Sequence, residues 1–316
     1  MLMNKHIYYL FLVAAALFFG ACSPEPEPEP RPPLADNSAI LPFLQQHRPQ
    51  RQQFVVDAQN PGTITGSNGT QVIFGPQAFT RPDGSAVTGQ VQLEMIEIYD
   101  RGDMILAQMP PVFNGRLLVT AGEIYLNAKQ QGTTLRVTNS RMQLPQKDTI
   151  PSASPKELFS GRGANGTWQR PAAGDTVLVD YITADSAASG IAYYEVSFTN
   201  DTIGWINVAH VNQTATARAV NGILEGLETY HGFVVYCVYG GGVRAVSPFS
   251  VHQNGQIYST ISLPDLIPVT LVAIGKQNDK FYYGEAKFES GPAEIYHHIP
   301  VAEIPEPDLV AKLDSL

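Results

Sequence analysis

Five Asn-Gly pairs constrain the fold of this chain more than any other feature of its sequence. Asn and Gly both tolerate the positive φ angles of tight two-residue hairpin turns. Most of the pairs stand between short runs that are rich in β-branched and aromatic residues. The pairs begin at Asn68, Asn114, Asn165, Asn221 and Asn254. We therefore expect short antiparallel strands joined by hairpins.

The stretch from Gln90 to Ile98 is the clearest predicted strand. Its first apolar residues alternate with polar ones, which is the period of a half-buried strand. The alternation stops at Ile96, so we expect either a bulge or burial on both faces from there on.

Helical patterns are few. Phe43 and Leu44 follow Ile40 at helical spacing, behind a possible cap at Asp36 or Ser38. Asp308 is a possible cap for a short C-terminal helix with Leu309, Leu313 and Leu316 on one face. Long amphipathic helices and internal repeats are absent from the sequence, so we predict an all-β fold.

The first residues have the pattern of an export signal. Lys5 precedes an apolar run, Ile7 to Phe19, which is too short to span a bilayer but long enough for the core of a signal peptide. The run ends in Gly20-Ala21-Cys22, which resembles the lipobox of bacterial lipoproteins, where the cysteine is acylated after cleavage. Phe19 departs from that pattern, which prefers leucine at its position. We expect lipidation at Cys22.

The segment after Cys22 is proline-rich and acidic. Proline fixes φ and removes a backbone donor, so Ser23 to Pro33 predicts a semi-rigid spacer. Glutamates directly after the cysteine also resemble the export tag of Bacteroidota-type lipoproteins. That resemblance implies a lipid-anchored protein of the outer membrane, exposed at the cell surface.

Charge and cysteine content exclude some partners and bonds. The chain has 20 Lys and Arg against 29 Asp and Glu, a formal charge of −9, which argues against nucleic acid as a partner. Cys237, the only other cysteine, stands in an apolar run. With Cys22 acylated it has no partner for a disulfide, and we expect a buried structural thiol.

Several motifs carry a family resemblance. The string Gly69 to Phe79, then Asn114 to Leu118 and Gly122 to Tyr125, resembles uncharacterised Bacteroidota-type surface lipoproteins. Its first half is more distantly similar to the ZU5 β-sandwich, and Gly204-Trp205-Ile206-Asn207 matches the second half of the same lipoproteins. The resemblance implies β-sandwich structure and carries over no chemistry.

Two β-sandwich modules in tandem, behind a lipidated proline-rich tether, are the predicted organisation. A linker-like stretch rich in Pro, Ser and Gly separates them. The predicted segments are a signal peptide at 1–21, a tether at 22–35, a short helical or linker segment at 36–52, a ZU5-like β-sandwich at 53–145, a linker at 146–174, a second β-sandwich at 175–298, and a tail with a short helix at 299–316.

Motifs for catalysis, metal or cofactor binding are missing. The histidines are scattered, and adjacent His297 and His298 would point to opposite faces of a strand. No Gly-x-Ser-x-Gly elbow or phosphate-binding loop occurs. Glu94, Glu97 and Glu123 are the remaining candidates for an acid–base pair, so a hydrolase with an unrecognised site stays an alternative. We predict no catalytic residues, no metal and no cofactor.

Aromatic residues concentrate in the second predicted module. Exposed rings there could stack on sugars or on a protein, although core packing is the commoner role. The candidate stacking residues are Tyr193, Tyr194, Trp205, Tyr282 and Tyr283. The sequence favours a non-enzymatic surface binding or scaffold module with an envelope protein as partner; the alternative is a glycan-binding accessory lipoprotein of a nutrient-uptake system.

Short Asp-Ser/Thr motifs predict a modification. Bacteroidota-type exported proteins carry O-glycans at such pairs when an apolar residue follows, and glycans belong on exposed loops. Good turn chemistry is the competing explanation of the same pairs. The candidate O-glycosylation sites are Thr149, Thr176, Ser186 and Thr202.

Overall fold

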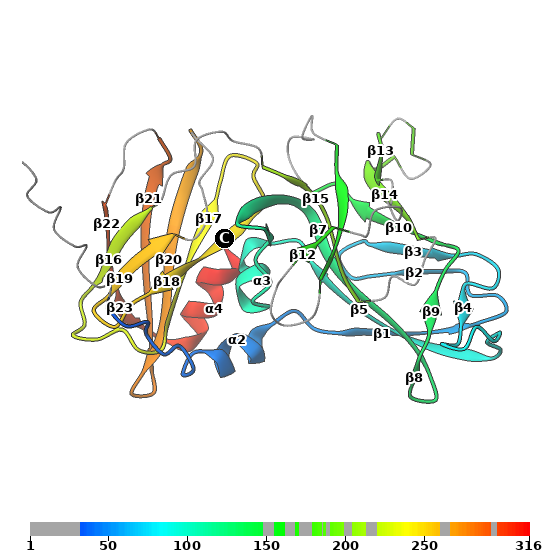
Figure 1. Cartoon of the computed structure of the whole chain (residues 1–316), viewed down its shortest axis with the longest axis horizontal. Coiled ribbons are helices and arrows are strands. Elements are labelled where there is room, and N and C mark those ends of the chain that lie inside the picture. The colour runs from blue at the N-terminus through cyan, green and yellow to red at the C-terminus, as the bar shows by residue number, and fades with distance from the viewer. Residues whose placement is uncertain are drawn as a thin grey trace, which may run out of the picture. The chain divides into compact units, whose positions relative to one another are not determined.

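The computed structural model describes most of the chain after residue 31. The described ranges are 32–147, 155–161, 168–170, 179–184, 186–187, 190–198, 204–212, 220–259, 266–291 and 296–316. Leu34–Leu316 form one compact unit. The predicted signal peptide and Cys22 lie outside the described residues, as does nearly all of the predicted tether. The fold is all-β, which confirms the predicted class, and the described part contains three short helices (Figure 1).

Two sheets form a β-sandwich-like half. The central sheet has the order β1(Gln52–Asp57), β5(Gln90–Ile98), β7(Arg116–Gln130), β15(Gly204–Val211), β11(Glu157–Gly161), β12(Trp168–Gln169), and β6(Val112–Phe113) and β8(Thr133–Thr134) also pair with β7. The five-stranded sheet has the order β13(Val179–Ile182), β14(Tyr193–Phe198), β10(Ser140–Pro145), β3(Gln71–Phe74), β2(Thr63–Thr65). A small ribbon pairs β4(Phe79–Thr80) with β9(Arg136–Val137). Apolar side chains from the facing sides of the two large sheets, such as Leu93, Ile124 and Met142, form one core.

A third sheet, the C-terminal sheet, nearly closes on itself. Its order is β22(Tyr296–Pro300), β16(Asn221–Glu225), β19(Gln256–Ser259), β18(Val246–Val251), β17(Phe233–Tyr239), β20(Pro268–Gln277), β21(Lys280–Glu289), β23(Ala302–Ile304). Its two end strands, β22 and β23, are separated in the sequence by Val301 alone, so one continuous segment lies at both edges. The interior is filled by Phe233, Leu271 and other apolar side chains.

Helices fill the space between the central sheet and the C-terminal sheet (Figure 1). They are α2(Leu41–His47), α3(Arg101–Leu106) and α4(Glu306–Asp314). Leu44, Ile105 and Leu309 bury their side chains in a core that also takes residues from both sheets. None of the helices in the described ranges is long and apolar enough to cross a membrane.

The structure confirms the local predictions that rest on the spacing of apolar residues. In β5, burial alternates up to Met95 and then covers both faces through Ile98, as the broken pattern at Ile96 predicted. The predicted helices exist, and Phe43, Leu44, Leu309 and Leu313 are buried, but Leu316 lies beyond the end of α4 and is only half-buried. The predicted caps are wrong: Ile40 and Pro305 occupy the N-cap positions, and neither helix has a side-chain cap hydrogen bond. The Asp36 carboxylate instead accepts hydrogen bonds from Ser38.

Strand pairing does not follow the predicted linker at 146–174. β14 pairs with β10, and β15 pairs with β7, so strands from both sides of that stretch share the same sheets. The C-terminal sheet begins only with β16. Pairing between strands that are far apart in the sequence decides which strands share a sheet. The Pro, Ser and Gly content of a connecting segment does not reveal that pairing.

The contact between α3 and α4 makes a testable electrostatic prediction. Burial, first, and then the charges of Asp100 and Asp314 raise the pKa of Asp103 to about 6, while Lys147 opposes the shift. A raised carboxyl pKa means that the folded state loses stability as the pH rises from about 4 to 6. Allowing for solvent screening, we expect Asp103→Asn to raise the free energy of unfolding at pH 7.5 by about 1 kcal/mol.

Urea unfolding at pH 4 and pH 7.5 measures this effect. The gain of Asp103→Asn should vanish at pH 4, because the native carboxyl is then protonated. Asp180→Asn, at an exposed position of β13, should change the stability at neither pH. An equal effect of Asp103→Asn at both pH values would contradict the expectation.

Candidate functional site

Two surfaces of the sandwich-like half are candidates for binding. One is a groove on the outer face of the five-stranded sheet, and the other is an aromatic patch on the central sheet. Each is built from neighbouring strands in known register, so the side chains of each have fixed relative positions.

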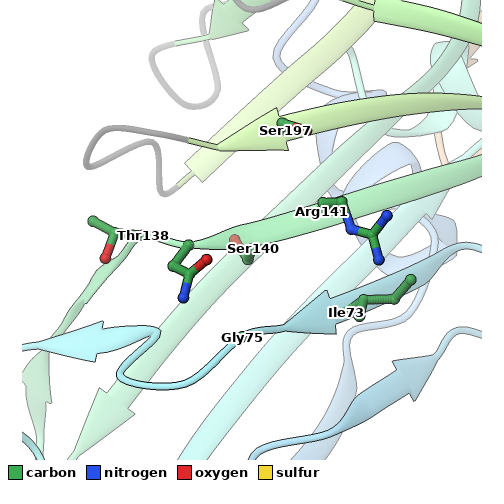
Figure 2. Close-up of a pocket in the computed structure, with 7 residues that line it drawn as sticks. Ile73, Gly75, Thr138, Ser140, Arg141 and Ser197 are labelled. Carbon is green, nitrogen blue, oxygen red and sulfur yellow. The ribbon is translucent and has the colours of Figure 1, made fainter.

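The groove lies where β3 and β14 end and β10 begins. Ile73, Arg141 and Ser197 are opposite one another on these three strands and form a row across the sheet (Figure 2). The cavity has a volume of about 670 Å³, and its remaining lining residues are Gly75, Thr138, Asn139 and Ser140. Its size is typical of small-molecule sites, although hydroxyl, amide and guanidinium groups make it more polar than most.

Two features shape the end of the groove. Asn139 has φ 46° and donates from its side chain to the Pro76 carbonyl at 2.8 Å. A Cβ at Gly75 would lie 2.6 Å from the Asn139 amide, so only glycine fits there. The Arg141 guanidinium is exposed and makes a long 3.4 Å contact with Glu195, which leaves most of its donors facing solvent.

The aromatic patch centres on Trp205. We define the Trp205 patch as Trp205 on β15, Tyr125 and Asn127 on β7, Glu94 on β5, and Arg51, which precedes β1. Trp205 and Tyr125 are directly opposite in the strand register, both half-buried, with ring centroids 5.4 Å apart and planes tilted by 52°. Beside them, Gly161 separates Trp205 from the fully buried Trp168.

Charged groups border these rings. The Arg51 guanidinium lies 5.4 Å from the centre of the Tyr125 ring and 3.2 Å from Glu94 Oε2. Asn127 and Lys129 also donate to Glu94 Oε2, at 3.2 Å each. Partial burial alone would raise the pKa of Glu94, but the hydrogen bonds from Lys129 and Asn127 and the charge of Arg51 lower it, so the carboxylate stays ionised.

The other predicted stacking residues lie on β14 and β21, apart from the Trp205 patch. Tyr194 is buried in the sandwich core, whereas Tyr193 is half-buried on the opposite face of β14. Tyr282 packs against the interior of the C-terminal sheet. Tyr283 is buried on the other face of β21, where its hydroxyl donates to Glu285 at 2.8 Å. Of the residues in the Trp205 patch, the sequence singled out Trp205 as a stacking candidate but not Tyr125 or Arg51, because only the strand register brings these residues together.

The candidate carboxylates for acid–base chemistry do not face one another. Glu97 lies on the side of β5 opposite to Glu94 and accepts hydrogen bonds from the backbone of Asn68 and Thr70. Glu123 is fully buried, and burial raises its pKa well above the usual value. Its Oε1 accepts a hydrogen bond from Asn207, and its Oε2 has no hydrogen-bond partner among the described residues. Each of these side chains is thus held in a separate environment.

The remaining predictions concern metal ligands, the buried cysteine and the glycosylation sites. Within the described ranges, no three His, Cys, Asp or Glu side chains gather as metal ligands would. Cys237 is buried, and that burial raises the pKa of its thiol to about 12. Ser186 is exposed in a turn that begins at Thr183. The other glycosylation candidates, Thr149, Thr176 and Thr202, lie outside the described residues.

Comparison of the chain with protein-family models, with curated proteins and with solved structures gave no match. The similarity to surface lipoproteins and to the ZU5 module therefore stays an expectation from the sequence motifs.

Proposed function

We propose that this chain is a non-enzymatic binding module, anchored to the outer membrane by a lipid on Cys22 and displayed at the cell surface, that holds an envelope protein at the groove of the five-stranded sheet. The observation that carries the proposal is the row Ile73, Arg141 and Ser197 on a sheet face that no other layer of the described residues covers.

The central sheet is buried on both faces along β7, whereas the five-stranded sheet is buried on one face only. Residues 117–124 of β7 are all buried, because cores lie on both sides of that strand. The five-stranded sheet buries Met142 and Leu144 inward but leaves Arg141 exposed and Gln143 half-exposed outward. An ordered sheet face that ends in a groove gives a partner a rigid surface, which lowers the entropic cost of binding.

The groove has the chemistry of a protein-binding surface. Arginine is enriched at protein interfaces, and its planar guanidinium can take a carboxylate of the partner in two hydrogen bonds. Hydroxyl groups of Thr138 and Ser197 add donors and acceptors, and Ile73 supplies apolar contact. These properties favour a partner that presents an acidic side chain beside a small apolar one.

Site-specific crosslinking in intact cells tests the proposal. A photoreactive phenylalanine at position 197 should give a defined adduct with one envelope protein, which mass spectrometry identifies. We expect Arg141→Glu to reduce this adduct at least tenfold, since it places a second negative charge where the partner carries its own.

The same probe at Tyr296, an exposed position of the C-terminal sheet, is the matched control and should give no such adduct. An adduct that survives Arg141→Glu, or that forms equally from position 296, would remove the groove as the contact site.

A further inference from the structure

We infer that the Trp205 patch binds a neutral saccharide chain, a second ligand at a site separate from the groove. The inference goes beyond the proposed function, because the patch lies on the central sheet and uses no residue of the groove. It makes the chain a binding protein for glycan as well as for an envelope protein.

The two half-buried rings are held rigidly. Trp205 and Tyr125 are opposite each other on β15 and β7. Their side chains pack at the margin of the core that the helices form with the central and C-terminal sheets. A Cβ at Gly161 would lie 3.0 Å from the Trp168 ring and 3.1 Å from Trp205 Cβ, so glycine lets the two indoles come close. Trp168 is in turn fixed by its indole N–H, which donates to the Pro110 carbonyl at 3.2 Å. Little side-chain entropy is left to lose when a ligand stacks on Trp205.

Hydrogen-bonding capacity at the patch is unused by the described part of the chain. Neither the Tyr125 hydroxyl nor the Trp205 indole N–H has a hydrogen-bond partner there, and both rings are accessible. The ion pair with Arg51 and the hydrogen bonds from Asn127 and Lys129 all involve Oε2 of Glu94, which leaves Oε1 without a hydrogen-bond partner among the described residues. A ligand with several hydroxyl groups, each both donor and acceptor, can satisfy this set.

The charge and shape of the patch favour sugar over other stacking ligands. Arg51 and Lys129 are already neutralised in part by Glu94, so the patch offers no strong field for a phosphate-bearing ligand. Sugar rings present apolar C–H faces to aromatic rings and hydroxyl edges to carboxylates and amides. The 52° tilt between the two ring planes fits successive sugar units of a twisted single chain better than the flat surface of a packed polysaccharide.

Titration of the full-length protein in detergent with neutral hexasaccharides tests the inference. The probes are maltohexaose, cellohexaose, xylohexaose, laminarihexaose and mannohexaose, followed by calorimetry and by tryptophan fluorescence. We expect at least one probe to bind saturably, Trp205→Ala to weaken that binding at least tenfold, and Trp205→Phe to retain part of it. Glu94→Gln should weaken it several-fold by removing an ionised acceptor.

Matched controls separate this site from the groove and from misfolding. Tyr296→Ala removes an exposed aromatic elsewhere and should leave binding unchanged, as should Arg141→Glu. Loss of binding in Arg141→Glu together with undiminished binding in Trp205→Ala would move the sugar to the groove and overturn the inference. Absence of saturable binding to all five probes would also overturn it, and neither result would alter the crosslinking test of the groove.

Discussion

Cys22→Ala is expected to abolish the incorporation of palmitate into this protein completely. The thiol of Cys22 is the proposed acyl acceptor, and alanine has no group that could replace it. Two or three acyl chains anchor a protein stably, whereas a chain without them has no membrane anchor that the sequence predicts. Metabolic labelling with palmitate, followed by fractionation of the cells, measures both consequences.

Cys237→Ala is the matched control for this experiment. Cys237 is the chain's other cysteine, it is buried in the C-terminal sheet, and burial raises the pKa of its thiol to about 12. An unreactive, inaccessible thiol should contribute nothing to labelling, so Cys237→Ala should label like the native protein. Palmitate labelling that persists in Cys22→Ala would refute the lipid anchor and with it the proposed location.

The strands were predictable where local pattern and local pairing agree. β5 follows the alternation of its sequence up to Met95, and Asn114-Gly115 forms the hairpin turn into β7 with φ 47° and 71°. Asn221-Gly222, the same pair of residues, lies inside β16 instead. There the strand pairs in parallel with β22, and a Cβ at Gly222 would clash with the His297 carbonyl. Glycine at this position therefore allows the two strands to lie close together and does not form a turn.

The binding surfaces were less predictable, because they depend on strand register between distant segments. Trp205 was identifiable as an aromatic residue on a strand. Its neighbour Tyr125 comes from β7 and Arg51 from the segment before β1, and no spacing in the sequence relates them. The groove combines β3, β10 and β14 in the same way. No motif in the sequence around Arg141 indicates that this residue lines the groove.

The carboxylate of Glu97 shows how burial without charge pairing can be stabilising, and it carries the second large prediction. Glu97 is 2% exposed and accepts hydrogen bonds from the backbone N–H groups of Asn68 and Thr70, at 2.9 and 3.0 Å, and from the Gln52 amide at 2.9 Å. A Cβ at Gly66 would lie 2.3 Å from the carboxylate, so the turn between β2 and β3 wraps closely around it.

We expect Glu97→Ala to lower the free energy of unfolding by about 3 kcal/mol, because it leaves the buried N–H of Thr70 and the partly buried donors of Asn68 and Gln52 without an acceptor. Glu97→Gln keeps the shape but turns an amide N–H₂ toward donors, so it should cost about 2 kcal/mol. Gln92→Ala, at an exposed position of the same strand, should cost less than about 0.5 kcal/mol. Urea denaturation at pH 7 measures all three, and Glu97→Gln gives the answer if the alanine variant does not fold.

The same carboxylate also predicts how stability depends on pH. Burial alone would raise the pKa of Glu97, but the hydrogen bonds from Thr70, Asn68 and Gln52 outweigh it and lower the pKa. A lowered carboxyl pKa contributes stability that is fully present above the unfolded value of about 4.3 and is lost as the pH falls through the folded pKa. The difference in stability between native protein and Glu97→Gln should therefore shrink below about pH 4. A difference that stays constant from pH 7 to pH 3 would mean that the turn needs the shape of Glu97 and not its charge.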